Sequence, residues 1–200
     1  MNFADRLTLF RIILAPAFFI VYLLPVWLPA WFPGGAAWTV APLWIIAVIS
    51  EFTDMLDGLA ARRMKITSDF GKLFDPFADT LMQVTAFFCF VIDGIFPAVL
   101  FLVVLYREFA ILFLRNLMLR KGVAMGARVS GKIKTVSYIC AAAVALLYAS
   151  LCRLDAAASL QPVVKIAAVV VFGVSVLFSV LSFFDYFLMY RSVGENDSNG

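Results

Sequence analysis

Residues 54–79 read DMLDGLAARRMKITSDFGKLFDPFAD, a short charged segment between two long apolar stretches of the chain. Asp54 and Asp57 are three residues apart, and Asp75 and Asp79 are four residues apart. On an α-helix either spacing places both side chains on one face. Because the polar segment between the two pairs is short, we predict two antiparallel neighbouring helices whose acidic ends meet at the same depth.

The whole chain is too apolar for a water-soluble domain. Of its 200 residues, 64% are hydrophobic and only 14% are charged, whereas soluble domains are about 45–50% apolar and about 25% charged. A helical span needs about 20 apolar residues, and the stretches that qualify are residues 7–28, 40–61, 71–92, 96–118, 134–151 and 165–190. The predicted fold class is therefore all-α, a polytopic integral membrane bundle of six transmembrane helices. The net charge of +3 is too small to indicate nucleic acid as a partner.

Positive charge is unevenly distributed among the predicted loops. Most of the 16 lysine and arginine residues lie near the termini or at residues 62–72 and 115–134, and the loop at residues 25–43 has none. Cytoplasmic loops of membrane proteins carry the excess of basic residues. Both termini and the acidic helix ends are therefore predicted to face the cytoplasm.

The four aspartates would repel one another unless protons or a cation lay between them. The chain has no histidine, and its three cysteines form no metal-binding pair, so the ligands would all be oxygen atoms. Oxygen ligands suit Mg²⁺, Mn²⁺ or Ca²⁺ rather than zinc, and paired hard cations beside a lipid surface indicate phosphate chemistry. We predict a divalent metal cofactor, two ions of Mg²⁺ or Mn²⁺, held by Asp54, Asp57, Asp75 and Asp79.

Small residues accompany these acids. Gly58 and Ala61 each follow an aspartate by one helical turn, and their missing side chains open a groove on the helix. Arg62 could pair with a phosphate, and Gly71 allows a helix or ligand to approach closely. A divalent-cation transporter is an alternative, although it would spread its acids over several spans. A purely structural membrane protein would leave the acids unexplained.

The complete pattern is D-x-x-D-G-x-x-A-R-x8-G-x-x-x-D-x-x-x-D, and it resembles the signature of the CDP-alcohol phosphatidyltransferase family. The resemblance implies a homodimer of six-helix subunits with a cavity that faces the cytoplasm. It implies attack on the phosphate nearer the diacylglycerol of CDP-diacylglycerol, with loss of CMP. It also implies that the four aspartates are metal ligands and that Asp79 is the catalytic general base. The CDP-diacylglycerol contacts that it implies are Asp5, Thr8, Asp54, Gly58, Ala61, Arg62, Ser68 and Gly71.

Other stretches are similar to the branch of the family that uses glycerol 3-phosphate. They are LTLFRIILAP at residues 7–16, Arg107-Glu108, residues 131–135 and Asp185-Tyr186. This similarity implies transfer of the phosphatidyl group to glycerol 3-phosphate in phospholipid biosynthesis, at a bacterial inner membrane. The acceptor's phosphate needs cations, and the candidates are Arg107, Arg115, Lys132 and Lys134. Inositol phosphate, serine and phosphatidylglycerol are the alternative acceptors.

Three further acids have no assigned role. Glu51 lies just upstream of the signature, and Asp185 either ties two helices together or contacts substrate. Glu108 shares a helix face with Arg115, so an ion pair between them is an alternative to phosphate binding, and Arg107 would need another partner. The membrane domain is predicted to cover residues 1–191, and residues 192–200 form a polar C-terminal tail.

Overall fold

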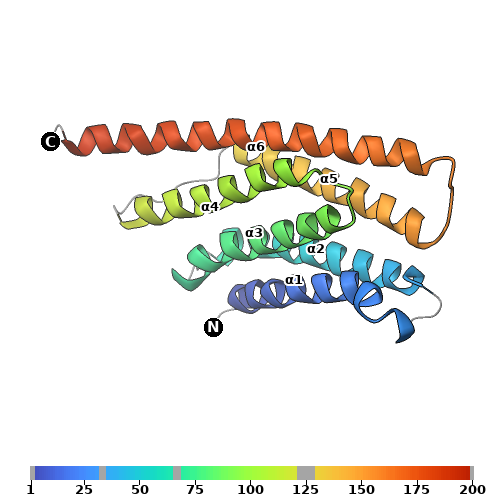
Figure 1. The fold of residues 1–200 in the computed structure, drawn as a ribbon. Helices are drawn as coiled ribbons and strands as arrows, with labels where there is room; N and C mark the ends of the chain where they lie inside the picture. Colours follow the sequence, from blue (N-terminus) through green and yellow to red (C-terminus); the bar gives the residue numbers. More distant parts are fainter. Residues whose placement is uncertain (1–2, 32–34, 65–68, 121–128, 199–200) are drawn as a thin grey trace.

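The computed structural model describes residues 3–31, 35–64, 69–120 and 129–198, with side chains for 6–31, 35–55, 74–119 and 129–191. These ranges hold six α-helices and two short 3-10 helices (Figure 1). The α-helices are α1 (Phe3–Trp27), α2 (Val40–Met64), α3 (Asp69–Ile92), α4 (Ala98–Arg120), α5 (Val129–Arg153) and α6 (Gln161–Ser198). The 3-10 helices η1 (Pro29–Trp31) and η2 (Ala37–Thr39) lie between α1 and α2.

The prediction of an all-α fold with six helices is confirmed, and the observed helices lie where the apolar stretches placed them. The largest difference is α6, which continues to Ser198 although its apolar stretch ends near residue 190. A helix satisfies its own backbone hydrogen bonds, so it can extend beyond apolar sequence. Among the described residues, four segments rather than the predicted six are long and apolar enough to cross a membrane: Arg6–Trp27, Phe74–Ile92, Val129–Arg153 and Gln161–Arg191.

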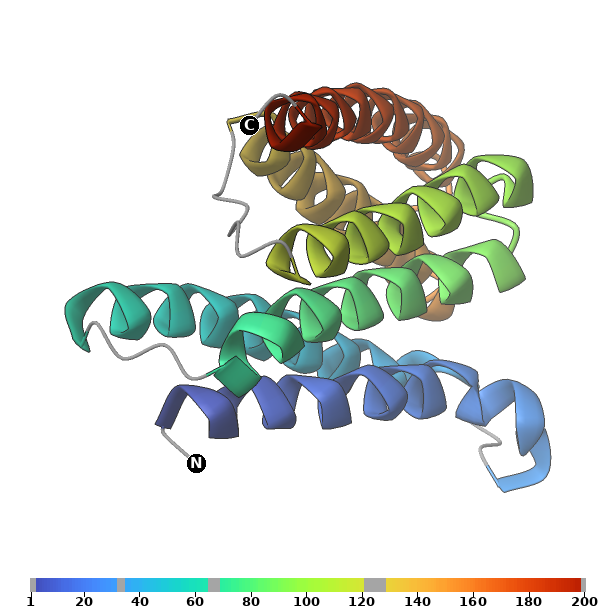
Figure 2. The same cartoon turned by 90° about the vertical axis from the view of Figure 1, so that its left-hand side faces the viewer.

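The helices form two groups (Figures 1 and 2). In the first group α1 packs against both α2 and α3, and in the second α6 packs against both α4 and α5. Contacts of α3 with α4 and α5 join the groups. The sequence predicted that α2 and α3 would be antiparallel neighbours. Among the described residues each of them packs mainly on α1, which therefore carries side chains into the space between their acidic ends.

An aromatic cluster joins the two groups of helices. The ring of Phe87 in α3 lies 5.1 Å from that of Tyr138 in α5 and 5.2 Å from that of Phe172 in α6, measured between centroids. Phe96 stacks on Phe172 at 3.9 Å. Phe96 follows the turn between α3 and α4, where Gly94 adopts a φ of 65° that favours glycine. This packing fixes α3, α5 and α6 relative to one another.

A polar clamp closes the end of the bundle at which α3 terminates. The clamp consists of Tyr22, Thr39, Asp93 and Arg153. Arg153 donates hydrogen bonds to Thr39 Oγ1 at 2.6 Å and to the carbonyl oxygen of Tyr22 at 3.1 Å. The Tyr22 hydroxyl donates to Asp93 Oδ2 at 2.5 Å. Because Asp93 and the acids Asp75 and Asp79 lie toward opposite ends of α3, the clamp holds the bundle together far from the acidic cluster.

Candidate functional site: an acidic cluster beside a basic cavity

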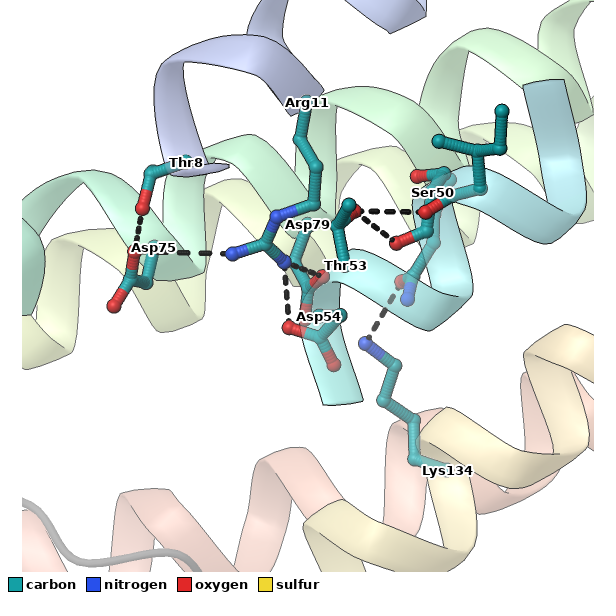
Figure 3. Close-up of polar contacts among 10 residues, drawn as sticks. Thr8, Arg11, Ser50, Thr53, Asp54, Asp75, Asp79 and Lys134 are labelled. Atoms are coloured by element: carbon teal, nitrogen blue, oxygen red, sulfur yellow. Dashed lines mark hydrogen bonds and ion pairs between the residues drawn. The ribbon is translucent and has the colours of Figure 1, made fainter. Parts of the chain in front are cut away.

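Arg11 of α1 lies at the centre of the acidic cluster (Figure 3). Its Nη1 atom is 2.5 Å from Asp54 Oδ1 and 3.0 Å from Asp79 Oδ1, and its Nη2 atom is 3.8 Å from Asp75 Oδ1. Thr8, one helical turn earlier in α1, also donates a hydrogen bond to Asp75 Oδ1. Two helices, α2 and α3, thus bring three carboxylates to one guanidinium group of α1.

The prediction that the acids meet is confirmed for Asp54, Asp75 and Asp79, while the side chain of Asp57 lies outside the described side chains. The role of Arg11 was missed, because in the sequence it is one of many cations near the termini and in the predicted cytoplasmic loops. A signal was present: Thr8 and Arg11 are three residues apart on one face of an apolar helix. A charge at that position is costly unless it has a partner.

We expect Arg11→Met to destabilise the protein in metal-free buffer. Arg11 is only 1% exposed, and its loss would leave the three carboxylates facing one another without this cation. Breaking a fully buried ion pair costs about 3–5 kcal/mol. The carboxylates are 43%, 44% and 39% exposed, so we expect a smaller loss of about 2 kcal/mol. Thermal unfolding in detergent with a chelator measures it.

The control for this variant is Arg6→Met, which removes an exposed cation from the same helix. It should leave the unfolding temperature close to that of the unchanged protein. An equal fall in both variants would mean that the contacts of Arg11 with the three acids contribute nothing specific to stability.

The donor set of the cluster fits a hard divalent cation in its chemistry. The groups that surround Arg11 are carboxylates, which Mg²⁺ and Mn²⁺ prefer. Among the described residues no three cysteine or acidic side chains are placed to share one ion as they stand. A guanidinium group lies at the point where the carboxylates of Asp54, Asp75 and Asp79 converge. Holding an ion there would require these groups to turn from Arg11 toward it.

Two of the eight predicted CDP-diacylglycerol contacts lie in the acidic cluster, and the other six fall outside the described side chains. Thr8 and Asp54 belong to the acidic cluster, since they contact Asp75 and Arg11. The other predicted contacts lie outside the described side chains; they are Asp5, Gly58, Ala61, Arg62, Ser68 and Gly71.

A cavity of about 440 Å³ borders the cluster. Three acids and all four predicted phosphate-binding residues line it: Asp54, Asp79, Glu108, Arg107, Arg115, Lys132 and Lys134. These residues come from α2, α3, α4 and α5, so residues that are far apart in the sequence share one wall. The sequence indicated each of the four basic residues separately as a candidate phosphate ligand, and the fold brings them together next to Asp79.

Glu108 carries the main ion pairs of this cavity. Its Oε1 atom lies 2.9 Å from Arg107 Nη1 and 3.0 Å from Lys134 Nζ. The alternative of an ion pair between Glu108 and Arg115 is therefore wrong, and Glu108 is itself the partner that Arg107 was expected to need. Both side chains are long enough to bend toward each other, and Lys134 approaches from α5.

The other polar side chains of the cavity also have defined surroundings. The guanidinium group of Arg115 lies 5.8 Å from the centre of the Tyr186 ring, and its buried Nε atom has no hydrogen-bond partner among the described residues. A Cβ atom at Gly131 would lie 3.1 Å from the Tyr186 hydroxyl, which explains a glycine there. Asp185, which does not line the cavity, accepts a hydrogen bond from Ser130 at 2.6 Å and so ties α6 to α5.

Fold and site together define a multi-pass, α-helical membrane protein in which an acidic cluster borders a basic cavity. The family model for CDP-alcohol phosphatidyltransferase matches residues 1–181. The chain belongs to the CDP-alcohol phosphatidyltransferase family and is therefore a transferase. The alternatives of a divalent-cation transporter and of a purely structural protein are thereby wrong.

Individual relatives carry a more specific name, CDP-diacylglycerol--glycerol-3-phosphate 3-phosphatidyltransferase. A protein of Treponema pallidum with this name is 37% identical over 190 residues, covering 93% of this chain and 88% of that protein. One from Bacillus subtilis is 36% identical over 149 residues, covering 74% and 77%. One from Escherichia coli strain K12 is 39% identical over 85 residues, covering 42% and 41%.

Proposed function

We propose that this protein transfers the phosphatidyl group of CDP-diacylglycerol to glycerol 3-phosphate, giving phosphatidylglycerol phosphate and CMP in phospholipid biosynthesis. The observation that carries the proposal is the basic cavity beside Asp79, which offers Arg107, Arg115, Lys132 and Lys134 to an anionic acceptor. Serine has no phosphate that would need four basic residues. The names of the relatives support the same acceptor.

In the proposed reaction the four basic residues bind the phosphate of the acceptor and point its free hydroxyl toward Asp79. Asp79 takes the proton of that hydroxyl as the general base. The hydroxyl oxygen forms a new bond to the phosphorus nearer the diacylglycerol, and the bond from that phosphorus to the CMP oxygen breaks. Holding both reactants in line supplies much of the rate enhancement, because positioning alone can replace a costly bimolecular encounter.

The aspartates Asp54, Asp57, Asp75 and Asp79 would hold two divalent ions, Mg²⁺ or Mn²⁺. When bound, such ions neutralise the diphosphate and stabilise the charge that develops on the leaving CMP. The convergence of Asp54, Asp75 and Asp79 on one cationic group supports this assignment. The proposed nucleotide contacts are Asp5, Thr8, Asp54, Gly58, Ala61, Arg62, Ser68 and Gly71.

A second, apolar cavity supports a donor with a lipid portion. It measures about 390 Å³ and is lined by residues that include Phe52, Met55, Met82 and Glu51. Gln83 lines both this cavity and the basic one, so the two lie on either side of it. A substrate with a polar headgroup and apolar chains matches this pairing of surfaces.

The proposal includes a placement in the membrane. All six helices would span the bacterial inner membrane, with the active site and both termini at the cytoplasmic face, residues 1–191 as the membrane domain and 192–200 as a polar tail. Both termini lie at the same end of the bundle in Figure 1, which supports this orientation. Exposed apolar residues such as Ile13, Val136 and Ile166 suit contact with membrane lipid. A homodimer is proposed from the family resemblance alone.

The test is the release of CMP by the purified protein from CDP-diacylglycerol in the presence of each acceptor. Glycerol 3-phosphate is expected to support turnover, and inositol phosphate, serine and phosphatidylglycerol at equal concentration are not. Release of CMP with another alcohol but not with glycerol 3-phosphate would replace the acceptor and leave the reaction class intact.

A further inference from the structure

Glu108 is an acidic residue in a cavity proposed to bind an anion. Its side chain is only 4% exposed, and the residue lies in the middle of α4. A carboxylate would repel a phosphate group at this place. Its presence therefore needs an explanation that lies in its contacts with the basic residues.

One oxygen atom of Glu108 contacts cations from two different helices. Oε1 lies 2.9 Å from Nη1 of Arg107 in α4 and 3.0 Å from Nζ of Lys134 in α5. The two cations are 7% and 9% exposed. Because both nitrogen atoms touch the same oxygen, Glu108 fixes the distance between the two positive groups.

Further contacts fix the rest of each basic side chain. Arg107 donates from Nε to the carbonyl oxygen of Ser179 at 3.1 Å and from Nη2 to Ser182 Oγ at 3.1 Å. Lys134 donates to Gln83 Oε1 at 3.3 Å and lies 4.4 Å from the centre of the Tyr138 ring. All of these partners are uncharged, so among the described contacts of the two cations Glu108 supplies the negative charge.

Two buried cations that face each other without an anion repel, and a lysine in that position tends to lose its proton or to move toward water. With Glu108 between them, the three side chains carry a net charge of +1, and both cations can stay charged. A binding group that is already oriented loses less conformational freedom when its ligand arrives.

We propose that Glu108 is a positioning residue for the acceptor: it holds Lys134 and Arg107 side by side, charged and directed at the acceptor's phosphate, without contacting the acceptor itself. This inference rests on the proposed function, because it assumes an acceptor that carries a phosphate. It assigns to Glu108 the orientation of the phosphate-binding pair rather than a part in the chemical step.

The experiment compares steady-state constants of the full-length protein in detergent micelles. Glu108→Gln keeps the size of the side chain and removes its charge. It should raise the KM for glycerol 3-phosphate at least tenfold, while kcat and the KM for CDP-diacylglycerol change less than threefold. Glu108→Asp keeps the charge and should give a smaller increase. The control Asp185→Asn makes the same chemical change at a helix-tying acid outside the cavity and should alter neither KM.

A double-variant cycle separates positioning from a general loss of structure. If Glu108 acts through Lys134, Glu108→Gln should add less than twofold to the acceptor KM in a Lys134→Met background. That double variant removes one anion and one cation together. It can therefore still be compared with Lys134→Met if Glu108→Gln alone fails to fold. The proposal would be overturned if the effects of Glu108→Gln and Lys134→Met on the acceptor KM multiplied fully in the double variant. It would also be overturned if the KM values of both substrates changed equally.

The acceptor that supports CMP release by the unchanged protein shows whether the proposed acceptor or the proposed role of Glu108 is wrong. If it releases CMP only with a different phosphate-bearing alcohol, the proposed acceptor is wrong, and the same KM comparison is made with that alcohol. If its acceptor carries no phosphate, Glu108 cannot have the role assigned here, and the inference is overturned together with the acceptor.

Discussion

Replacing Asp79 with asparagine is expected to lower the rate of CMP release by about 1,000-fold, in the range that loss of a general base usually gives. The variant keeps the shape of the side chain but cannot accept the proton of the attacking hydroxyl. It also removes one of the carboxylates that converge on Arg11, at 3.0 Å from its Nη1 atom. The measurement is the initial rate of CMP release at saturating CDP-diacylglycerol and glycerol 3-phosphate.

Asp185→Asn is the matched control for Asp79→Asn. Asp185 accepts a hydrogen bond from Ser130 and connects α5 to α6, so its loss should change the rate less than tenfold. Monodisperse elution of both variants from a sizing column shows that they remain folded. If Asp79→Asn turns over within tenfold of the unchanged protein, Asp79 is not the base.

Removing divalent cations is expected to abolish CMP release, a loss of about 1,000-fold or more, because a bound metal contributes several kcal/mol to a phosphoryl-transfer transition state. The donors proposed for the ions are the carboxylates of Asp54, Asp57, Asp75 and Asp79, and three of these already share one cationic partner. Dialysis against EDTA followed by titration with Mg²⁺ or Mn²⁺ measures the dependence. Either ion should restore the rate.

Two controls make this second result specific to the cluster. EDTA that is already saturated with Mg²⁺ should leave the rate unchanged. Asp54→Asn should shift the Mg²⁺ titration to higher concentrations, and Asp185→Asn should not. Full activity in protein that elemental analysis finds free of divalent metal would contradict the proposed cofactor.

The positions of the helices and the family of the protein could both be predicted from short-range sequence patterns. Long apolar stretches favour helices, so composition alone located all six helices, and four segments of the described residues are long and apolar enough to cross a membrane. The four-residue spacing placed Asp75 and Asp79 on one face, and their shared contact with Arg11 agrees. The fixed spacing of the signature identified the family that the comparison then confirmed.

Charge pairing between helices was predicted poorly. The sequence favoured Glu108–Arg115 because both residues lie on one face of one helix, and the structure instead pairs Glu108 with Arg107 and with Lys134 of α5. It also gave no role to Arg11, although that residue is almost fully buried among the acids. In each case the deciding partner lies on another helix.

The amino-acid sequence by itself determined that this chain is a bundle of membrane-type helices with an acidic signature typical of phosphatidyl transfer, because those properties depend on composition and on spacing within one helix. Only the tertiary structure decided that α1 inserts Arg11 between the acids and that Glu108 bridges cations of α4 and α5. The physical reason is that contacts between helices depend on how each helix is rotated and packed against its neighbours. Residues as distant as Arg11 and Asp79 acquire their relation only through that packing.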